Sequence, residues 1–317
     1  MDIYLPIAEI STNALWLLVL GAVAGFLSGL FGVGGGFILT PLLTFMGVPP
    51  TIAVGTQANQ LAGTSLSGAI AQWRRHSIDL KMGTVLMLGS FVGTGVGVQI
   101  FSWLEQVGQV NLVIKFSYVL LLSVVGVIMF IESAPNLLKK AARIRKTSSK
   151  PREEPIMDER GVRMGWHATS SWGITFPESN LRLSATLPLG IGFVGGVLVG
   201  LLGIGGGFVM VPAMIYILHM PPSLVNGTSL FQIVFTTILA TVLQAVSNQS
   251  VDLVLALILL LGSVVAVPFG TRLATRLKPE VARFLMSMIV LAVVFKLVYD
   301  LLVMPDQLFS VDMRKLI

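Results

Sequence analysis

The chain has 317 residues, of which 54% are hydrophobic and only 11% are charged, and its mean hydropathy is +0.87. Soluble domains carry roughly a quarter charged residues, so this composition excludes an ordinary soluble protein and predicts a membrane protein. Cysteine is absent, which excludes disulfides, thiolate metal sites and cysteine nucleophiles. The formal net charge of +6 does not predict nucleic-acid binding, because the basic residues lie in short loops beside apolar segments, where they orient membrane helices.

Apolar runs of the length that spans a membrane, about 20 residues, occur in two sets of four. The first set lies at residues 14–46, 53–73, 82–103 and 110–131, and the second at 186–218, 225–247, 253–271 and 283–303. We expect residues 1–131 to form a first membrane repeat, 132–185 a hydrophilic cytoplasmic linker and 186–317 a second membrane repeat. The first 13 residues contain no Lys or Arg, so no signal peptide is expected. Within the linker, alternation at residues 172–176 and 181–185 predicts a small hairpin.

The two sets repeat one sequence pattern, which predicts a duplicated architecture. Nine residues of the first segment recur in the fifth at a constant spacing of 171 positions. They are Gly21, Gly25, Gly29, Gly32, Gly34, Gly35, Gly36, Phe37 and Pro41, which recur as Gly192, Gly196, Gly200, Gly203, Gly205, Gly206, Gly207, Phe208 and Pro212. At a spacing of 172, Gly55, Thr56, Gln60, Thr64 and Gln72 recur as Gly227, Thr228, Gln232, Thr236 and Gln244; at 173, Asp79, Gly89 and Gly97 recur as Asp252, Gly262 and Gly270. The first three glycines of each set lie on one helical face and predict close helix packing.

Loop charges indicate that the two repeats are inverted relative to each other. Arg74, Arg75 and Lys81 follow the second segment, whereas the equivalent SNQSVDL of the second repeat has no basic residue. Conversely, WLEQVGQV after the third segment has none, but four basic residues, Arg272, Arg276, Lys278 and Arg283, crowd the equivalent loop. Basic loops prefer the cytoplasm, and inversion needs an odd number of crossings per repeat, so the first segment must enter and leave on one side. We predict an all-α polytopic membrane protein with two homologous four-segment repeats, each opening with a glycine-broken or re-entrant helix; the alternative is two parallel repeats of four plain crossings.

The glycine clusters at residues 32–36 and 203–207 are the first candidate site. Four glycines in five residues each cost a helix about 1 kcal/mol against alanine, so the pattern favours an unwound backbone. A half-helix that begins near Phe37 or Phe208 points free amides and the positive end of its dipole at the membrane interior, where they bind anions. The alternative is a glycine hinge for tight helix crossing. Candidate substrate-binding residues are Gly34, Gly35, Gly36, Phe37, Gly205, Gly206, Gly207 and Phe208, and we expect the two clusters to meet near the bilayer midplane.

A polar stripe on the second segment of each repeat is the other half of the candidate site. Thr56, Gln60 and Thr64 are spaced four apart and therefore share one helical face. Neutral amides and hydroxyls can donate to an oxyanion without a buried cation; the alternative is hydrogen bonding between helices, worth about 0.6 kcal/mol on average. The candidates are Thr56, Asn59, Gln60 and Thr64 in the first repeat and Thr228, Ser229, Gln232 and Thr236 in the second.

The remaining polar residues give no catalytic pattern. Lys115 and Lys296 lie inside predicted spans, where a charge is a functional candidate, but we expect both to snorkel to an interface. His76 and Asp79 follow the second segment, where we expect a solvated loop rather than a proton-handling pair. The other histidines are isolated and no nucleophile has a base nearby, so we predict no metal site, no cofactor and no enzyme.

The segments GFLSGLFGVGGGFILTPLL and AVGTQANQLAGTSLSG, with GLLGIGGGFVMVPAMIYILHMPPSLVNGTSLFQ, resemble the sulfite exporter TauE/SafE family. That family is also called the 4-toluene sulfonate uptake permease (TSUP) family. The resemblance covers both membrane halves, residues 14–131 and 186–303, and a long linker between halves is similar to a subgroup of the family. It implies a multi-pass inner-membrane transporter of sulfite, organosulfonates or related sulfur oxyanions.

The sequence therefore predicts a secondary transporter of a small sulfur-containing oxyanion, and we expect the direction of transport to be export. An anion channel is one alternative, and a non-transporting membrane subunit or sensor is another. The expected partners are a small anionic substrate and the lipid bilayer; a homo-oligomer is left open.

Overall fold

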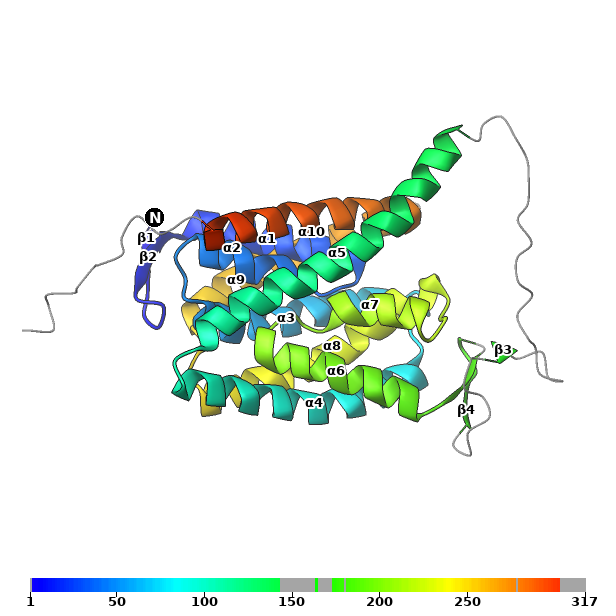
Figure 1. Ribbon diagram of the computed structural model, residues 1–317, viewed down its shortest axis with the longest axis horizontal. Coiled ribbons are helices and arrows are strands. Elements are labelled where there is room, and N and C mark those ends of the chain that lie inside the picture. The colour runs from blue at the N-terminus through cyan, green and yellow to red at the C-terminus, as the bar shows by residue number, and fades with distance from the viewer. Residues whose placement is uncertain (1, 143–162, 165–172, 180, 278, 303–317) are drawn as a thin grey trace, which may run out of the picture.

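The computed structural model describes residues 2–142, 163–164, 173–179, 181–277 and 279–302, and it is almost entirely helical (Figure 1). Within these residues, six helices are long and apolar enough to cross a membrane: α1 (Ala14–Phe31), α4 (Leu80–Gln106), α5 (Val110–Ala142), α8 (Pro222–Ser247), α9 (Leu253–Ala274) and α10 (Pro279–Leu302). The all-α polytopic fold is therefore confirmed. Helix α3 (Pro50–Trp73) is long enough to cross a membrane but more polar than these six. Helix α6 (Thr186–Leu202) is apolar but, at 17 residues, one residue too short to be counted with them.

The elements follow the predicted segments closely. The first half contains β1 (Asp2–Leu5), β2 (Ile10–Asn13), α1 (Ala14–Phe31), α2 (Gly36–Phe45), α3 (Pro50–Trp73), α4 (Leu80–Gln106) and α5 (Val110–Ala142). The second contains β4 (Gly173–Phe176), β5 (Leu181–Ser184), α6 (Thr186–Leu202), α7 (Gly207–Tyr216), α8 (Pro222–Ser247), α9 (Leu253–Ala274) and α10 (Pro279–Leu302), while β3 (Arg163–Met164) pairs with β5. Helix α5 runs beyond the predicted span into the segment expected to be linker, and projects from the bundle in Figure 1. The rest of the linker, residues 143–162 and 165–172, lies outside the described residues.

One β-hairpin precedes the first helix of each half. The hairpin predicted within the linker is confirmed, because β4 pairs antiparallel with β5. The sequence did not predict its counterpart, the antiparallel pair of β1 and β2. The same spacing of 171 positions relates the two, since Leu5 and Pro6 correspond to Phe176 and Pro177. Figure 1 shows the hairpins at opposite ends of the helix bundle, which we call the β1–β2 end and the β4–β5 end.

A buried aspartate fastens the β1–β2 hairpin to the helices. One carboxylate oxygen of Asp252 accepts from the amides of Ile7 (3.0 Å) and Ala8 (3.4 Å) in the hairpin turn. The other caps α9 by accepting from its first-turn amides, and the Asp252 amide donates to the Thr56 hydroxyl of α3 (2.9 Å). Helices α1, α3 and α9 therefore begin together at the β1–β2 end. Because α3 follows α2, the α1–α2 pair leaves this end and returns to it.

Asp79 makes the equivalent connections at the other end. Its carboxylate accepts from the Ser179 hydroxyl of the β4–β5 turn (2.6 Å) and from the Met82 amide of α4 (3.0 Å). Its amide donates to the Thr228 hydroxyl of α8 (3.0 Å). Helices α4, α6 and α8 therefore begin at the β4–β5 end. The expectation of a solvated loop is wrong for Asp79, whose side chain is 1% exposed, because the carboxylate is taken up as a helix cap.

Each major helix contact joins one half to the other. Gly21 faces Leu259 and Gly29 faces Val267, so α1 runs parallel to α9 with the two backbones in contact. The glycines of both sets, Gly21, Gly25 and Gly29 against α9 and Gly192, Gly196 and Gly200 against α4, leave no room for a Cβ atom. This confirms the predicted close packing.

The helices at equivalent positions in the two halves lie antiparallel. Ala58, early in α3, packs with Ala240, late in α8, whereas Ala69 packs with Leu230. Helices α5 and α10 are related in the same way, since Gly126 faces Val290 and the later Phe130 stacks on the earlier Phe284. The arrangement places the two glycine-broken segments, α1–α2 and α6–α7, across the bundle from each other.

Asp252→Ala is expected to lower the free energy of unfolding by about 2 kcal/mol or more, because it removes a helix cap and leaves hairpin amides without their acceptor. The melting temperature of the purified protein in detergent measures this. Asp300→Ala, which removes an exposed carboxylate from the last turn of α10, is the control and should leave the melting temperature unchanged. Equal shifts in the two variants would contradict the anchoring role.

Candidate functional site

Both glycine clusters break their helices as predicted. Helix α1 ends at Phe31, Gly32 caps it with φ 68°, and Gly35 precedes α2 with φ 70°. In the second half, Gly203 and Gly206 occupy the same positions with φ 67° and 72°. This left-handed backbone favours glycine over any other residue. The backbone geometry therefore requires glycine at these positions, and the neighbouring atoms also leave little room for a Cβ atom there.

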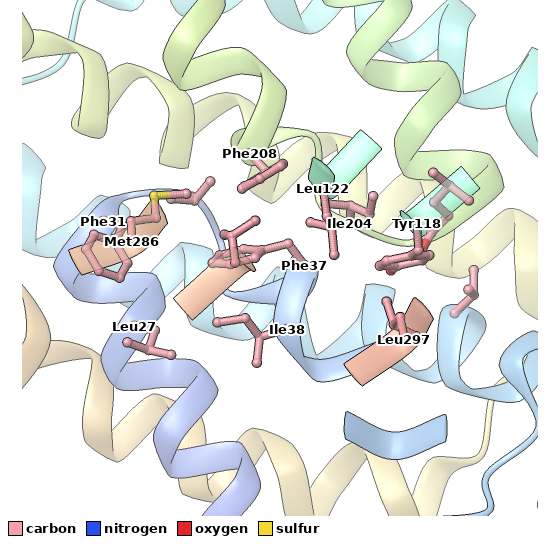
Figure 2. Close-up of a cluster of buried hydrophobic side chains, with 14 of the residues drawn as sticks. Leu27, Phe31, Phe37, Ile38, Tyr118, Leu122, Ile204, Phe208, Met286 and Leu297 are labelled. Carbon is pink, nitrogen blue, oxygen red and sulfur yellow. The ribbon is translucent and has the colours of Figure 1, made fainter. Parts of the chain in front are cut away.

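The two breaks meet inside the bundle. The rings of Phe37 and Phe208, at the starts of α2 and α7, stack with centroids 4.8 Å apart (Figure 2). A Cβ atom on Gly36 would lie 2.9 Å from the carbonyl oxygen of Ile204 in the opposite break. The prediction that the two backbones meet is confirmed; their position at the bilayer midplane stays a prediction.

Apolar side chains fill the space directly between the breaks. Leu61 of α3 and Ile233 of α8 both lie against the positions of Gly34 and Gly205. Phe37 and Phe208 are completely buried. An anion at either helix start must therefore lie beside this apolar contact rather than between the two rings.

The amides at both helix starts remain available. Within the described part of the chain, the backbone N–H groups of residues 34–36 and 205–207 donate to no backbone carbonyl. The first amides of a helix have no partner within the helix and carry the positive end of its dipole. Two such helix starts lie close together inside the bundle, and helix starts of this kind bind anions.

Gln60 is a buried side chain without a hydrogen-bond partner. It is 1% exposed, and neither its Nε2 nor its Oε1 atom has a partner within the described structure. It lies on the α3 face that carries Gln57, which donates to the Gly36 carbonyl (2.6 Å), and Leu61, which lies against Gly34. Burying an amide without a partner costs about 1–3 kcal/mol. A buried polar group in this condition is a candidate to bind a ligand or an ordered water.

The equivalent Gln232 is already engaged. Its Nε2 donates to the hydroxyls of Ser90 (2.6 Å) and Thr236 (2.8 Å), and only its Oε1 lacks a partner in the described residues. The two glutamines occupy equivalent positions in the repeats but differ in bonding. The candidate site is therefore asymmetric, with more unused hydrogen-bonding capacity on α3 than on α8.

The other predicted residues are spread along α3 and α8. Ser229 lies at the first break, where its hydroxyl donates to the Gly32 carbonyl (2.8 Å). Thr64 donates within its own helix, to the carbonyls of Gln60 and Leu61, and Asn59 is only partly buried. Thr56 and Thr228 lie at opposite ends of the bundle, where each accepts from an aspartate amide. The structure brings the glycine clusters, Ser229 and the glutamine-bearing faces together, and leaves Thr56 and Thr228 apart.

Sequence reasoning missed a polar cluster on the same site. Gln57 donates to the carbonyls of both Gly36 and Gly203 (2.6 and 2.7 Å), and so links the two breaks. Thr40 donates to Gln57, and the Tyr118 hydroxyl donates to the Leu202 carbonyl (2.7 Å). The comparison of the two repeats did not mark Gln57, because the residue at the equivalent position of the second repeat is Ser229 and not another glutamine. A comparison of polar character rather than identity would have found it, since both residues donate to the opposite break.

The charged and metal-binding groups agree with a site of neutral donors. Lys296 is exposed and its Nζ lies 4.0 Å from the centroid of the Phe45 ring, near the β1–β2 end. Among the described residues, no three His, Asp or Glu side chains gather to hold a metal ion.

A family model described as sulfite exporter TauE/SafE matches residues 17–297, a range that contains both glycine breaks and both glutamines. The chain belongs to the TauE/SafE family. Its relatives include the probable membrane transporter protein YjnA of Bacillus subtilis (strain 168), which is 31% identical over 285 residues. That match covers 89% of this chain and 98% of the relative.

Two further relatives place this TauE/SafE protein among membrane transporters. Probable membrane transporter protein YunE of Bacillus subtilis (strain 168) is 28% identical over 292 residues, which cover 90% of this chain and 97% of the relative. Sulfite exporter TauE/SafE family protein 1 of Arabidopsis thaliana is 32% identical over 88 residues, covering 28% of this chain and 20% of the relative. No solved structure matches the chain. The protein is thus a multi-pass membrane protein of a transporter family.

Proposed function

We propose that this TauE/SafE protein is a secondary transporter that exports a small sulfur-containing oxyanion such as sulfite or an organosulfonate. The observation that carries the proposal is the meeting of two broken helices beside helix α3, whose face toward the breaks also carries the buried Gln60, partnerless within the described structure. Broken helices that meet between repeats are where secondary transporters bind their substrates. The description of the family supports a sulfur oxyanion as the substrate.

In the proposed membrane topology, the two repeats are inverted and the β4–β5 end faces the cytoplasm. The antiparallel pairing of α3 with α8 and of α5 with α10 supports inversion. The basic residues of the loops belong to the β4–β5 end: Arg74 and Arg75 follow α3, Lys81 lies in the first turn of α4, and Arg272 and Arg276 lie near the end of α9. Basic loops prefer the cytoplasmic side of the inner membrane.

Export needs no coupling ion in this arrangement. Moving one monovalent anion out of a cell with a negative interior is favourable by about 2.3 kcal/mol per 100 mV. Uptake would have to be coupled to protons or to another ion. The two buried aspartates of the described structure, Asp79 and Asp252, are both used as helix caps at the bundle ends. Because both carboxylates cap helices, neither is placed to carry a coupling proton, and this favours uncoupled export.

Counterflow in liposomes tests the transporter against a channel. Purified protein in vesicles preloaded with unlabelled sulfite is expected to accumulate external labelled sulfite transiently, because a carrier exchanges substrate across two gated states. A channel would only equilibrate the label, and this result would overturn the proposed mechanism.

Deleting residues 143–162 should leave counterflow intact; lost counterflow in the folded deletion variant would instead favour a sensor or subunit that acts through the linker.

A further inference from the structure

A cavity of about 450 Å³ enters the bundle at the β4–β5 end. Its exposed rim includes Arg75, Ser223 and Thr275. Deeper in, it is lined by Asn226, which lies against the first glycine break: a Cβ atom on Gly32 would be 2.7 Å from the Asn226 Cβ. The cavity therefore reaches from the basic end of the protein to a residue that packs against the first glycine break.

At the β1–β2 end, four polar side chains join helices that belong to different halves. The Ser102 hydroxyl of α4 donates to the Asn248 Oδ1 atom (2.6 Å), and the Asn248 amide donates to the Gln244 Oε1 atom (2.6 Å). Ser250 also donates to Gln244 (3.3 Å). Gln244 in turn donates to the Gly200 carbonyl of α6 (2.9 Å). We call Ser102, Gln244, Asn248 and Ser250 the polar latch.

The repeat relates the polar latch to the cavity. At spacings of 172 and 173 positions, the equivalents of Gln244, Asn248, Ser250 and Ser102 are Gln72, Arg75, Ser77 and Thr275. All four equivalents line the cavity at the opposite end. The Arg75 guanidinium donates to the Thr271 carbonyl (3.3 Å), and the Ser77 hydroxyl to the Arg75 carbonyl (3.3 Å). The same four positions are thus bonded to one another at one end and spread around a cavity at the other.

We propose that these two sets of residues are the two gates of the transporter, with the polar latch closed and the cavity gate open in this structure. The inference rests on the proposed transport function and adds which residues seal each end. Two inverted repeats can exchange conformations, so that the open end closes as the closed end opens. In the exchanged state, Arg75 takes the part of Asn248 and bonds to Thr275 and Gln72.

The two gates differ in charge. Among the described residues that line the cavity, Arg75 alone is charged, whereas the polar latch is neutral. A fixed guanidinium raises the local concentration of anions at the open gate. An anion that passes the polar latch meets no such cation among the latch residues. This difference favours entry from the β4–β5 end, and it agrees with export.

Cysteine labelling tests the gates, because the chain has no cysteine of its own. Asn226→Cys reports on the cavity, and Val54→Cys, at the equivalent position beside Gly203, reports on the closed end. With the polar latch intact, a membrane-impermeant thiol reagent should modify Asn226→Cys from the β4–β5 side and leave Val54→Cys unmodified. Adding Asn248→Ala should raise the labelling rate of Val54→Cys about tenfold and lower that of Asn226→Cys, as the population shifts.

Thr241→Ala is the matched control, because Thr241 lies on the same helix but donates only to its own helix, at Thr237. It should change neither labelling rate. Ser102→Ala is the second latch variant and serves if Asn248→Ala does not fold. Unchanged labelling in a folded latch variant would overturn the gate assignment even if sulfite counterflow is normal. A switch in labelling without any sulfite counterflow would support the gates and overturn the proposed substrate.

Discussion

Gly93→Ala is expected to remove nearly all folded protein, although it adds a single methyl group. A Cβ atom at Gly93 of α4 would overlap the carbonyl oxygen of Phe193 in α6 and lie 3.0 Å from the amide nitrogen of Val197. Both neighbours are backbone atoms of a packed helix and cannot turn aside. Overpacking a core costs about 1–3 kcal/mol where side chains can adjust, so we expect a larger loss here.

Gly95→Ala is the matched control for this prediction. Gly95 lies on the same helix, and a Cβ atom there would meet nothing within 4 Å. Because alanine favours a helix over glycine, the variant should be unchanged or more stable by up to about 1 kcal/mol. The yield of monodisperse protein in detergent and its melting temperature measure both variants. Equal yields for the two would contradict the close α4–α6 contact.

Gln60→Leu is expected to abolish sulfite flux and to leave the melting temperature unchanged or higher. The side chain is buried and neither of its polar atoms has a partner in the described structure, so leucine removes no hydrogen bond. It also removes the cost of burying an unpaired amide. A fall in flux without a fall in stability would separate substrate binding from helix packing.

Gln232→Leu provides the comparison for Gln60→Leu. It loses two hydrogen bonds, to Ser90 and Thr236, each worth about 1 kcal/mol. This variant should therefore lose both stability and flux. Normal flux in Gln60→Leu would show that the free amide has no part in transport. A loss of folded Gln60→Leu would favour a packing role.

The sequence predicted the helices and the meeting of the breaks because both follow from strong, repeated patterns. Membrane-length apolar runs determine the helices, and clustered glycines at one spacing determine where α1 and α6 end. The strands of both hairpins have only four residues each; alternation of apolar and polar residues predicted the β4–β5 hairpin, and the β1–β2 hairpin was missed. Its equivalence to the β4–β5 hairpin is visible in Pro6 and Pro177 only once both are seen as strands.

The polar residues were harder to predict, because spacing gives the face of a helix but not the partner of a hydroxyl. Thr56 shares a face with Gln60, yet its hydroxyl is taken up by the Asp252 amide at the bundle end. Asn248 was not predicted for another reason. The equivalent residue of the first repeat is Arg75, so a search for identical residues in the two halves does not find it. Tertiary contacts between the two halves decide these roles, and no single segment contains them.

Net flux in liposomes under an imposed membrane potential tests the central claim most directly. Vesicles with the purified protein are challenged in turn with sulfite, sulfoacetate, thiosulfate and chloride, with the interior made negative or positive. We predict saturable movement of at least one sulfur oxyanion in the direction that the potential favours, little movement of chloride, and no movement through Gln60→Leu. Movement of none of the sulfur oxyanions, or of chloride at the same rate, would contradict the account.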